Sequence, residues 1–157
     1  MKIKGLNEYD ICNYKKPSMF VIFPSCTFKC DKDCGRAVCQ NSSLAKEPAI
    51  ECDIDRIVSR YINNPLTHAI VCGGLEPFDS KAELFFLVSR LREKTEDDIV
   101  IYTGYKEEEI TKEIESLKNF KNIIIKFGRF IPDNEGRDDE VLGVRLASDN
   151  QYARRIS

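Results

Sequence analysis

Four short apolar segments recur along the chain, and each is bounded by proline, glycine or polar residues. They cover residues 18–24 (SMFVIFP), 66–72 (LTHAIVC), 99–102 (IVIY) and 122–127 (NIIIKF). Continuous apolar runs of this length are typical of strands that are buried on both faces of a sheet. We therefore predict four interior strands.

Amphipathic segments at residues 53–63, 80–94 and 106–119 separate these runs. The first follows Asp53, an expected N-cap, and its apolar residues recur at helical spacing. Its expected buried face comprises Ile54, Ile57, Val58, Tyr61 and Ile62. The alternation of strands and helices predicts parallel strands joined by right-handed βαβ connections.

Weaker patterns flank this region. Alternating residues in MKIKGL, at positions 1–6, favour a short edge strand, and residues 141–146 favour a final strand before the tail SDNQYARRIS. Residues 132–140 (PDNEGRDDE) are polar and rich in turn formers. We interpret that segment as a solvated loop without chemistry.

Composition narrows the class of protein. The 157 residues are 42% hydrophobic with a net charge of −2, which fits one domain over residues 1–157 and argues against nucleic-acid binding through a basic face. No apolar run approaches the length of a membrane span, and the first ten residues lack the apolar centre of a signal peptide. With an odd number of cysteines, seven, we expect a cytoplasmic protein with reduced thiols and no membrane partner.

Four of the seven cysteines lie within residues 25–41 (SCTFKCDKDCGRAVCQN), directly after the first predicted strand. They are Cys26, Cys30, Cys34 and Cys39. Thiolates are the soft ligands preferred by iron–sulfur clusters and by zinc. The carboxyl end of a parallel strand is also where open α/β sheets and barrels place their chemistry.

The spacing of these cysteines favours iron–sulfur over zinc. Structural zinc sites usually combine two short ligand pairs separated by a dozen or more residues, often with histidine. This chain has no second pair, and its only histidine, His68, is far along the sequence. A [4Fe–4S] cluster held by three cysteines, with one iron left open, therefore fits better, and zinc is the alternative.

The order of four motifs resembles the radical S-adenosylmethionine superfamily. The cysteine loop follows the first strand, Gly73-Gly74 and Glu76 follow the second, YTGY (residues 102–105) follows the third, and Ser-x-Asn-Gln (residues 148–151) comes near the end. Within the superfamily, the chain looks most like the small activating proteins of anaerobic ribonucleotide reductase. The resemblance extends from about residue 20 to residue 156.

This resemblance implies a fold, two cofactors and a partner. The fold would be a partial, open (βα) barrel of parallel strands, shorter than the eight-unit barrel because four or five strands can be counted. The cofactors would be a [4Fe–4S] cluster and S-adenosyl-L-methionine, whose reductive cleavage gives a 5′-deoxyadenosyl radical. The partners would be a large glycyl radical enzyme and an electron donor such as flavodoxin or ferredoxin.

The third cluster ligand stays open between two cysteines. The superfamily typically shows C-x3-C-x2-C, whereas Cys34 and Cys39 both lie farther from Cys30 than this pattern requires. Val38-Cys39-Gln40-Asn41 is similar to the end of the family loop, so we favour Cys39 with an insertion within residues 31–38. Cys12, Cys52 and Cys72 are expected to be free thiols.

Binding of S-adenosyl-L-methionine is expected to involve the glycine motif and nearby aromatic residues. Gly73 and Gly74 would allow close backbone approach, and Glu76, followed by Pro77, would accept from the cofactor ammonium, although Leu75 interrupts the family's Gly-Gly-Glu-Pro. The alternative for the glycines is a simple chain reversal. Three aromatic residues, Phe28, Tyr102 and Tyr105, would pack either on adenine or in the core. Asn150 and Gln151 would either close over the cofactor or anchor the C-terminal tail.

Two other functional classes fit the same residues. One is a radical enzyme that acts directly on a peptide or small molecule, and the other is an iron–sulfur or zinc protein without catalysis. The short chain has little material for a substrate domain, which favours a protein partner as the target. The sequence indicates no general acid or base, so we assign no catalytic side chain.

Overall fold

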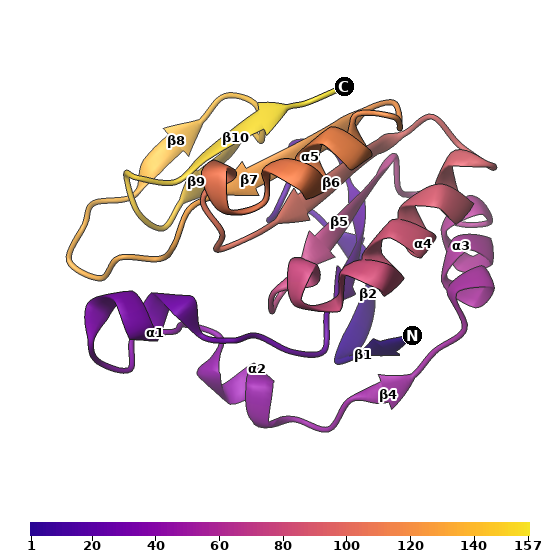
Figure 1. The fold of residues 1–157 in the computed structure, drawn as a ribbon. Coiled ribbons are helices and arrows are strands. Elements are labelled where there is room, and N and C mark those ends of the chain that lie inside the picture. The colour runs from indigo at the N-terminus through magenta and orange to yellow at the C-terminus, as the bar shows by residue number, and fades with distance from the viewer.

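A six-stranded, mostly parallel sheet forms the centre of the computed structural model, which describes residues 1–157 (Figure 1). Its strands lie in the order β10-β7-β6-β5-β3-β2. The parallel strands are β3 (Ser18–Ile22), β5 (Ala69–Gly73), β6 (Asp98–Tyr102) and β7 (Ile123–Phe127). The four predicted interior strands are therefore confirmed, and each lies within or close to its predicted range.

The edges of the sheet are antiparallel. β2 (Gly5–Asp10) pairs with β3, and β10 (Tyr152–Arg155) pairs with β7. The predicted edge strand at residues 1–6 is divided between β1 (Lys2–Ile3) and the start of β2. β1 pairs with β4 (Ile50–Glu51) outside the main sheet. The sheet is open, with β2 and β10 as its edges, and its curvature into a partial barrel stays a prediction.

Three helices cover one face of the sheet (Figure 1): α3 (Ile54–Ile62), α4 (Lys81–Arg92) and α5 (Thr111–Leu117). Short 3-10 turns, η1 (Pro77–Ser80) and η2 (Glu107–Glu109), precede α4 and α5. Asp53 caps α3 as predicted, because its side chain accepts a hydrogen bond from the Asp55 N–H at 2.9 Å. Ile62 is 46% exposed, contrary to prediction, because it is the last residue of α3, on the solvent flank of the buried stripe.

The opposite face of the sheet is covered by segments from both ends of the chain. Tyr14, Leu142 and Leu146 pack there against Val71 and Val100 in a second apolar cluster. The predicted strand at 141–146 is β9 (Val144–Leu146), which forms a separate hairpin with β8 (Arg137–Asp139). The strand that joins the main sheet is β10, in the tail for which we predicted none.

The cysteine-rich segment lies outside these two layers. It follows β3 and contains α1 (Lys29–Cys34) and α2 (Ser42–Lys46), neither of which has a buried residue. Figure 1 shows both helices beyond the end of the sheet, apart from α3, α4 and α5. No helix in the structure combines the length and the apolar character needed to cross a membrane.

Candidate functional site

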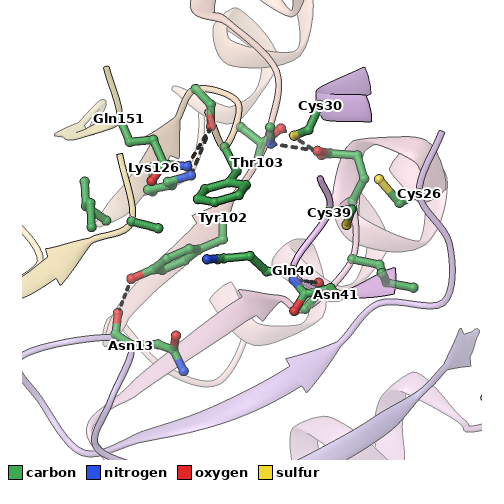
Figure 2. A pocket seen from close by; sticks show the side chains of 18 of the residues that line it. Asn13, Cys26, Cys30, Cys39, Gln40, Asn41, Tyr102, Thr103, Lys126 and Gln151 are labelled. Carbon is green, nitrogen blue, oxygen red and sulfur yellow. Dashed lines mark hydrogen bonds between the residues drawn. The ribbon is translucent and has the colours of Figure 1, made fainter. Parts of the chain in front are cut away.

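A cavity of about 420 Å³ lies where the loops after the parallel strands meet (Figure 2). Its lining includes Cys30 from the loop after β3, Glu76 from the loop after β5, Gly104 from the loop after β6 and Phe130 from the loop after β7. Parallel strands bring their carboxyl ends to one edge, so residues far apart in sequence converge there. The loops after all four parallel strands therefore contribute to one site.

Three of the four clustered cysteines face this cavity. Cys26, Cys30 and Cys39 line it, whereas Cys34 does not. Figure 2 shows the three side chains together on one side of the cavity. Burial raises the pKa of Cys26 to about 12 and also raises the pKa of Cys30, and a negative charge on Cys39 would raise both further. The fold thus brings the favoured ligand set together.

This donor set fits a [4Fe–4S] cluster. Each thiolate of such a cluster binds a different iron, so cluster ligands stand farther apart than the ligands of a single ion. No three His, Cys, Asp or Glu side chains are gathered closely enough to hold one metal ion. Cys26, Cys30 and Cys39 would hold the cluster, which when bound would supply one electron.

Glu76 reaches the cavity despite the inserted Leu75. Its carboxylate is buried and accepts hydrogen bonds from the Thr103 hydroxyl at 2.7 Å, the Gly104 N–H at 2.8 Å and the Phe78 N–H at 3.1 Å. Burial raises its pKa to about 7, and these three donors oppose the rise. Glu76 therefore places a carboxylate that is ready to ionise in the cavity.

The two glycines of the motif have different surroundings. Gly74, at φ 79°, lines the cavity, and its carbonyl oxygen accepts from the Asn41 side chain at 2.6 Å. Gly73 does not line the cavity, and a Cβ there would lie 3.0 Å from Tyr102 Cβ and 3.1 Å from Phe20 Cε2. Pro77 begins η1 and is also outside the cavity lining.

Of the aromatic candidates, only Tyr102 lines the cavity. Its hydroxyl donates to the Asn13 carbonyl oxygen at 2.6 Å. Phe28 adopts a left-handed conformation before α1, and its N–H donates to Cys26 Sγ at 3.3 Å. The hydroxyl of Tyr105 donates to Asp79 at 2.7 Å, and the Tyr105 side chain does not line the cavity.

The tail motif contributes one residue to the lining. The Gln151 side chain is buried, lines the cavity and donates to the Gly128 carbonyl oxygen at 3.2 Å. Asn150 is exposed, and its side chain donates to the Arg129 carbonyl oxygen at 3.0 Å. The structure therefore gives Asn150 an anchoring contact and places Gln151 at the cavity.

Lys126 is a buried cavity residue that the sequence analysis missed. Its ammonium donates to the Gly128 carbonyl oxygen at 3.0 Å and lies 6.0 Å from the centre of the Tyr102 ring. Burial lowers its pKa to about 8, and the negative charges of Cys30 and Glu76 oppose the fall. A lysine within the otherwise apolar run NIIIKF is the signal that could have identified it.

An ion-pair network around the buried Arg129 supports the cysteine loop from outside the cavity. The guanidinium of Arg129 donates to both carboxylate oxygens of Glu109, at 2.6 and 2.7 Å, and to the Gly104 carbonyl oxygen at 3.1 Å. Arg129 Nε also pairs with Asp33 Oδ2, on α1, at 2.5 Å. The network connects α1 to the loops after β6 and β7.

The other cysteines and the histidine occupy different surroundings. Cys72 is buried in β5, and burial raises its pKa to about 12. Cys52 is half-buried outside the cavity, and His68 is exposed. Cys12 is exposed and lies on the cavity lining, a position that the sequence did not indicate.

The fold is that of an α/β protein whose parallel sheet brings three thiols to one cavity at its carboxyl edge. The chain belongs to the 4Fe-4S single cluster domain family, which it matches over residues 17–152. No curated protein and no solved structure match the chain. The matched range contains all four clustered cysteines and most of the sheet, so the predicted iron–sulfur class is confirmed.

Proposed function

We propose that this iron–sulfur protein is a radical enzyme that cleaves S-adenosyl-L-methionine reductively. The observation that carries the proposal is the placement of Glu76 and Lys126, two buried groups of opposite charge, in the cavity that the three thiols line. An amino-acid head group offers an ammonium and a carboxylate, and each would find a complementary charge there. The bound cluster would supply the electron that breaks the carbon–sulfur bond and leaves methionine and a 5′-deoxyadenosyl radical.

The rest of the cavity suits the nucleoside part of this cofactor. Its volume of about 420 Å³ lies within the usual range of small-molecule sites. Phe20, Tyr102 and Phe130 provide apolar surface on which adenine could pack. Gly74 leaves the backbone uncovered beside them, which supports the proposed close approach to the methionine moiety.

We further propose that the radical abstracts a hydrogen atom from a glycine Cα of a partner enzyme similar to anaerobic ribonucleotide reductase. The electron donor would be a flavodoxin or a ferredoxin. Both faces of the sheet are covered by the chain's own helices and terminal segments, which leaves no separate unit to enclose a small substrate. A protein segment that enters the cavity is therefore favoured over a small molecule.

The test uses the reconstituted protein under anaerobic conditions. The reduced protein and S-adenosyl-L-methionine should give 5′-deoxyadenosine and methionine, measured by chromatography and mass spectrometry. Addition of the candidate reductase should give a glycyl radical doublet in electron paramagnetic resonance. Cys30→Ser should abolish both products, and Cys34→Ser should retain them.

Each negative result points to a different alternative. Cleavage without a glycyl signal would contradict the proposed partner and favour a peptide or small-molecule substrate. A stable cluster without cleavage would contradict the radical chemistry and leave a non-catalytic iron–sulfur protein.

A further inference from the structure

Apolar packing alone holds the cysteine loop weakly. Neither α1 nor α2 has a buried residue, and eight residues, 31–38, separate Cys30 from Cys39. Bringing two ligands together across a flexible loop costs conformational entropy. A specific contact is therefore needed to return Cys39 to the side of Cys30.

Asp31 makes that contact. Its Oδ1 accepts hydrogen bonds from the backbone N–H groups of Val38 and Cys39, both at 2.8 Å. Asp31 directly follows Cys30 in the chain. One side-chain oxygen thus connects the residue after Cys30 to the backbone of Cys39 through two hydrogen bonds.

The path of the chain between these residues agrees with this closure. α1 ends at Cys34, and Gly35, at φ 66°, terminates the helix with its N–H bonded to the Lys32 carbonyl oxygen at 3.3 Å. A left-handed glycine at this position reverses the chain. Residues 36–38 then return toward Asp31, and Cys34 is left outside the cavity lining.

Cys39 is also fixed on its other side. Its carbonyl oxygen accepts from the Ser42 N–H at 3.3 Å, at the start of α2. The Asn41 side chain donates to the Gly74 carbonyl oxygen at 2.6 Å, which attaches this part of the loop to the turn after β5. These two contacts fix the segment after Cys39. The N–H of Cys39 itself is bound only by Asp31.

We propose that Asp31 is the positioning residue that makes Cys39 the third cluster ligand. It closes the eight-residue segment and so allows a C-x3-C-x8-C sequence to present three thiols to one cavity. The inference deepens the cluster part of the proposed function and does not depend on cofactor cleavage. It predicts that an oxygen acceptor at position 31 is needed, and that a negative charge there is not.

The experiment compares five proteins after anaerobic reconstitution: the wild type, Asp31→Ala, Asp31→Asn, Cys34→Ser and Cys39→Ser. The readouts are iron and sulfide per chain, absorption at about 400 nm, and the rate of iron loss to a chelator, which reports cluster binding. Asp31→Ala should lose iron about tenfold faster or fail to retain the cluster, because two hydrogen bonds are removed. Asp31→Asn keeps an acceptor oxygen and should stay near the wild type, as should Cys34→Ser.

A second measurement needs no metal. In the apo-protein, Asp31→Ala should speed hydrogen exchange at the Val38 and Cys39 amides while the exchange of the β5 and β6 amides is unchanged. That unchanged exchange shows that the variant is folded. Asp31→Asn should restore slow exchange at both loop amides.

Three outcomes would overturn the inference. They are normal iron retention in Asp31→Ala, loss of iron in Asp31→Asn as complete as in Asp31→Ala, and loss of the cluster in Cys34→Ser with retention in Cys39→Ser. Failure of the wild type to cleave S-adenosyl-L-methionine would contradict the proposed function only, because none of these readouts involves that cofactor.

Discussion

The Gly104 N–H donates to Glu76 Oε2 at 2.8 Å and so joins the loop after β6 to the loop after β5. A Cβ on Gly104 would lie 3.6 Å from this oxygen and 3.7 Å from Cys30 Sγ. The backbone at Gly104 therefore lies beside both the carboxylate and a thiol of the candidate cluster site. Glu76, Gly104 and Cys30 form the junction of three loops that end three different strands.

The cysteines provide the most direct test of the site. Single serine substitutions at Cys26, Cys30 and Cys39 should each lower the iron content after reconstitution, because each removes a thiolate that faces the cavity. Cys34→Ser and Cys52→Ser serve as controls and should retain the cluster, because neither side chain lines the cavity. Iron and sulfide analysis with absorption spectroscopy measures the effect, and a loss confined to Cys34→Ser would refute this ligand set.

Glu76 should make the apo-protein's stability depend on pH. Its pKa is about 7 in the folded chain, because of burial, against an ordinary value of 4.5, so the folded state binds the proton more tightly. The free energy of unfolding should therefore fall as pH rises from about 4.5 to about 7 and then level off. The groups that face this carboxylate are the Thr103, Gly104 and Phe78 donors, with the charges of Asp79 and Lys126 nearby.

Glu76→Gln should reduce that fall, because an amide does not titrate. Urea denaturation of the two apo-proteins between pH 5 and pH 8 measures the difference, which is at most about 3 kcal/mol by linkage. Equal pH dependence in both proteins would show that other groups cause it.

Gly74→Ala should destabilise the protein by about 2–4 kcal/mol, since the strain of a left-handed backbone adds to the steric clash of the new Cβ. The residue has φ 79°, and an added Cβ would lie 2.6 Å from Ile22 Cγ2. Gly35→Ala is a matched control with φ 66° and no atom within 4 Å of the added Cβ, so it should cost only about 1–2 kcal/mol. Urea denaturation measures both effects.

A double-mutant cycle isolates the contact with Ile22. Ile22→Ala removes the atom that Gly74→Ala would meet, so the double variant should lose less stability than the sum of the single variants. Strict additivity would show that the left-handed conformation accounts for the whole cost.

Arg129→Met should destabilise the protein by about 1–2 kcal/mol, because it removes the hydrogen bonds and ion pairs of a buried guanidinium with Glu109 and Asp33, whose side chains are 27% and 51% exposed. The Arg129 guanidinium, which donates to both oxygens, lowers the pKa of Glu109 to about 2. The Arg129–Glu109 pair stabilises the folded state above about pH 4.5, and this stabilisation is lost as pH falls toward 2. The free energy of unfolding of the variant should therefore fall less than that of the wild type over this range.

The control for Arg129 is the exposed pair of Arg36 and Asp133, with side chains 64% and 85% exposed. Arg36→Ala should change stability by no more than about 0.5 kcal/mol. Denaturation curves from pH 2 to pH 7 compare the variants. A similar effect of both substitutions would contradict a special role for the network around Arg129.

Lys126→Met should weaken binding of S-adenosyl-L-methionine by about tenfold to a hundredfold, as expected for loss of a charged hydrogen-bond donor. Iron content should be unchanged, because Lys126 is not a ligand. Calorimetric titration of the reconstituted protein measures the affinity. Equal affinity in the variant and the wild type would remove Lys126 from the proposed cofactor site.

The sequence by itself determined the four parallel strands of the central sheet and the iron–sulfur class of the site. The four parallel strands were predictable because continuous apolar runs need burial on both faces, and α3 because its apolar residues recur at helical spacing behind a capping Asp53. The density of cysteines after the first strand indicated an iron–sulfur site, since thiolates are the ligands that such clusters use. These signals are local, and the residues that carry them lie close together in the chain.

Tertiary structure alone decided which residues meet. β10 has only Ala153 buried, so its place in the sheet depends on backbone pairing with β7 rather than on its own pattern. Lys126 enters the cavity because β7 lies next to β6, and Cys39 faces it because Asp31 closes the intervening segment. Contacts of this kind depend on long-range strand order and on single hydrogen bonds, and neither leaves a periodic pattern in the sequence.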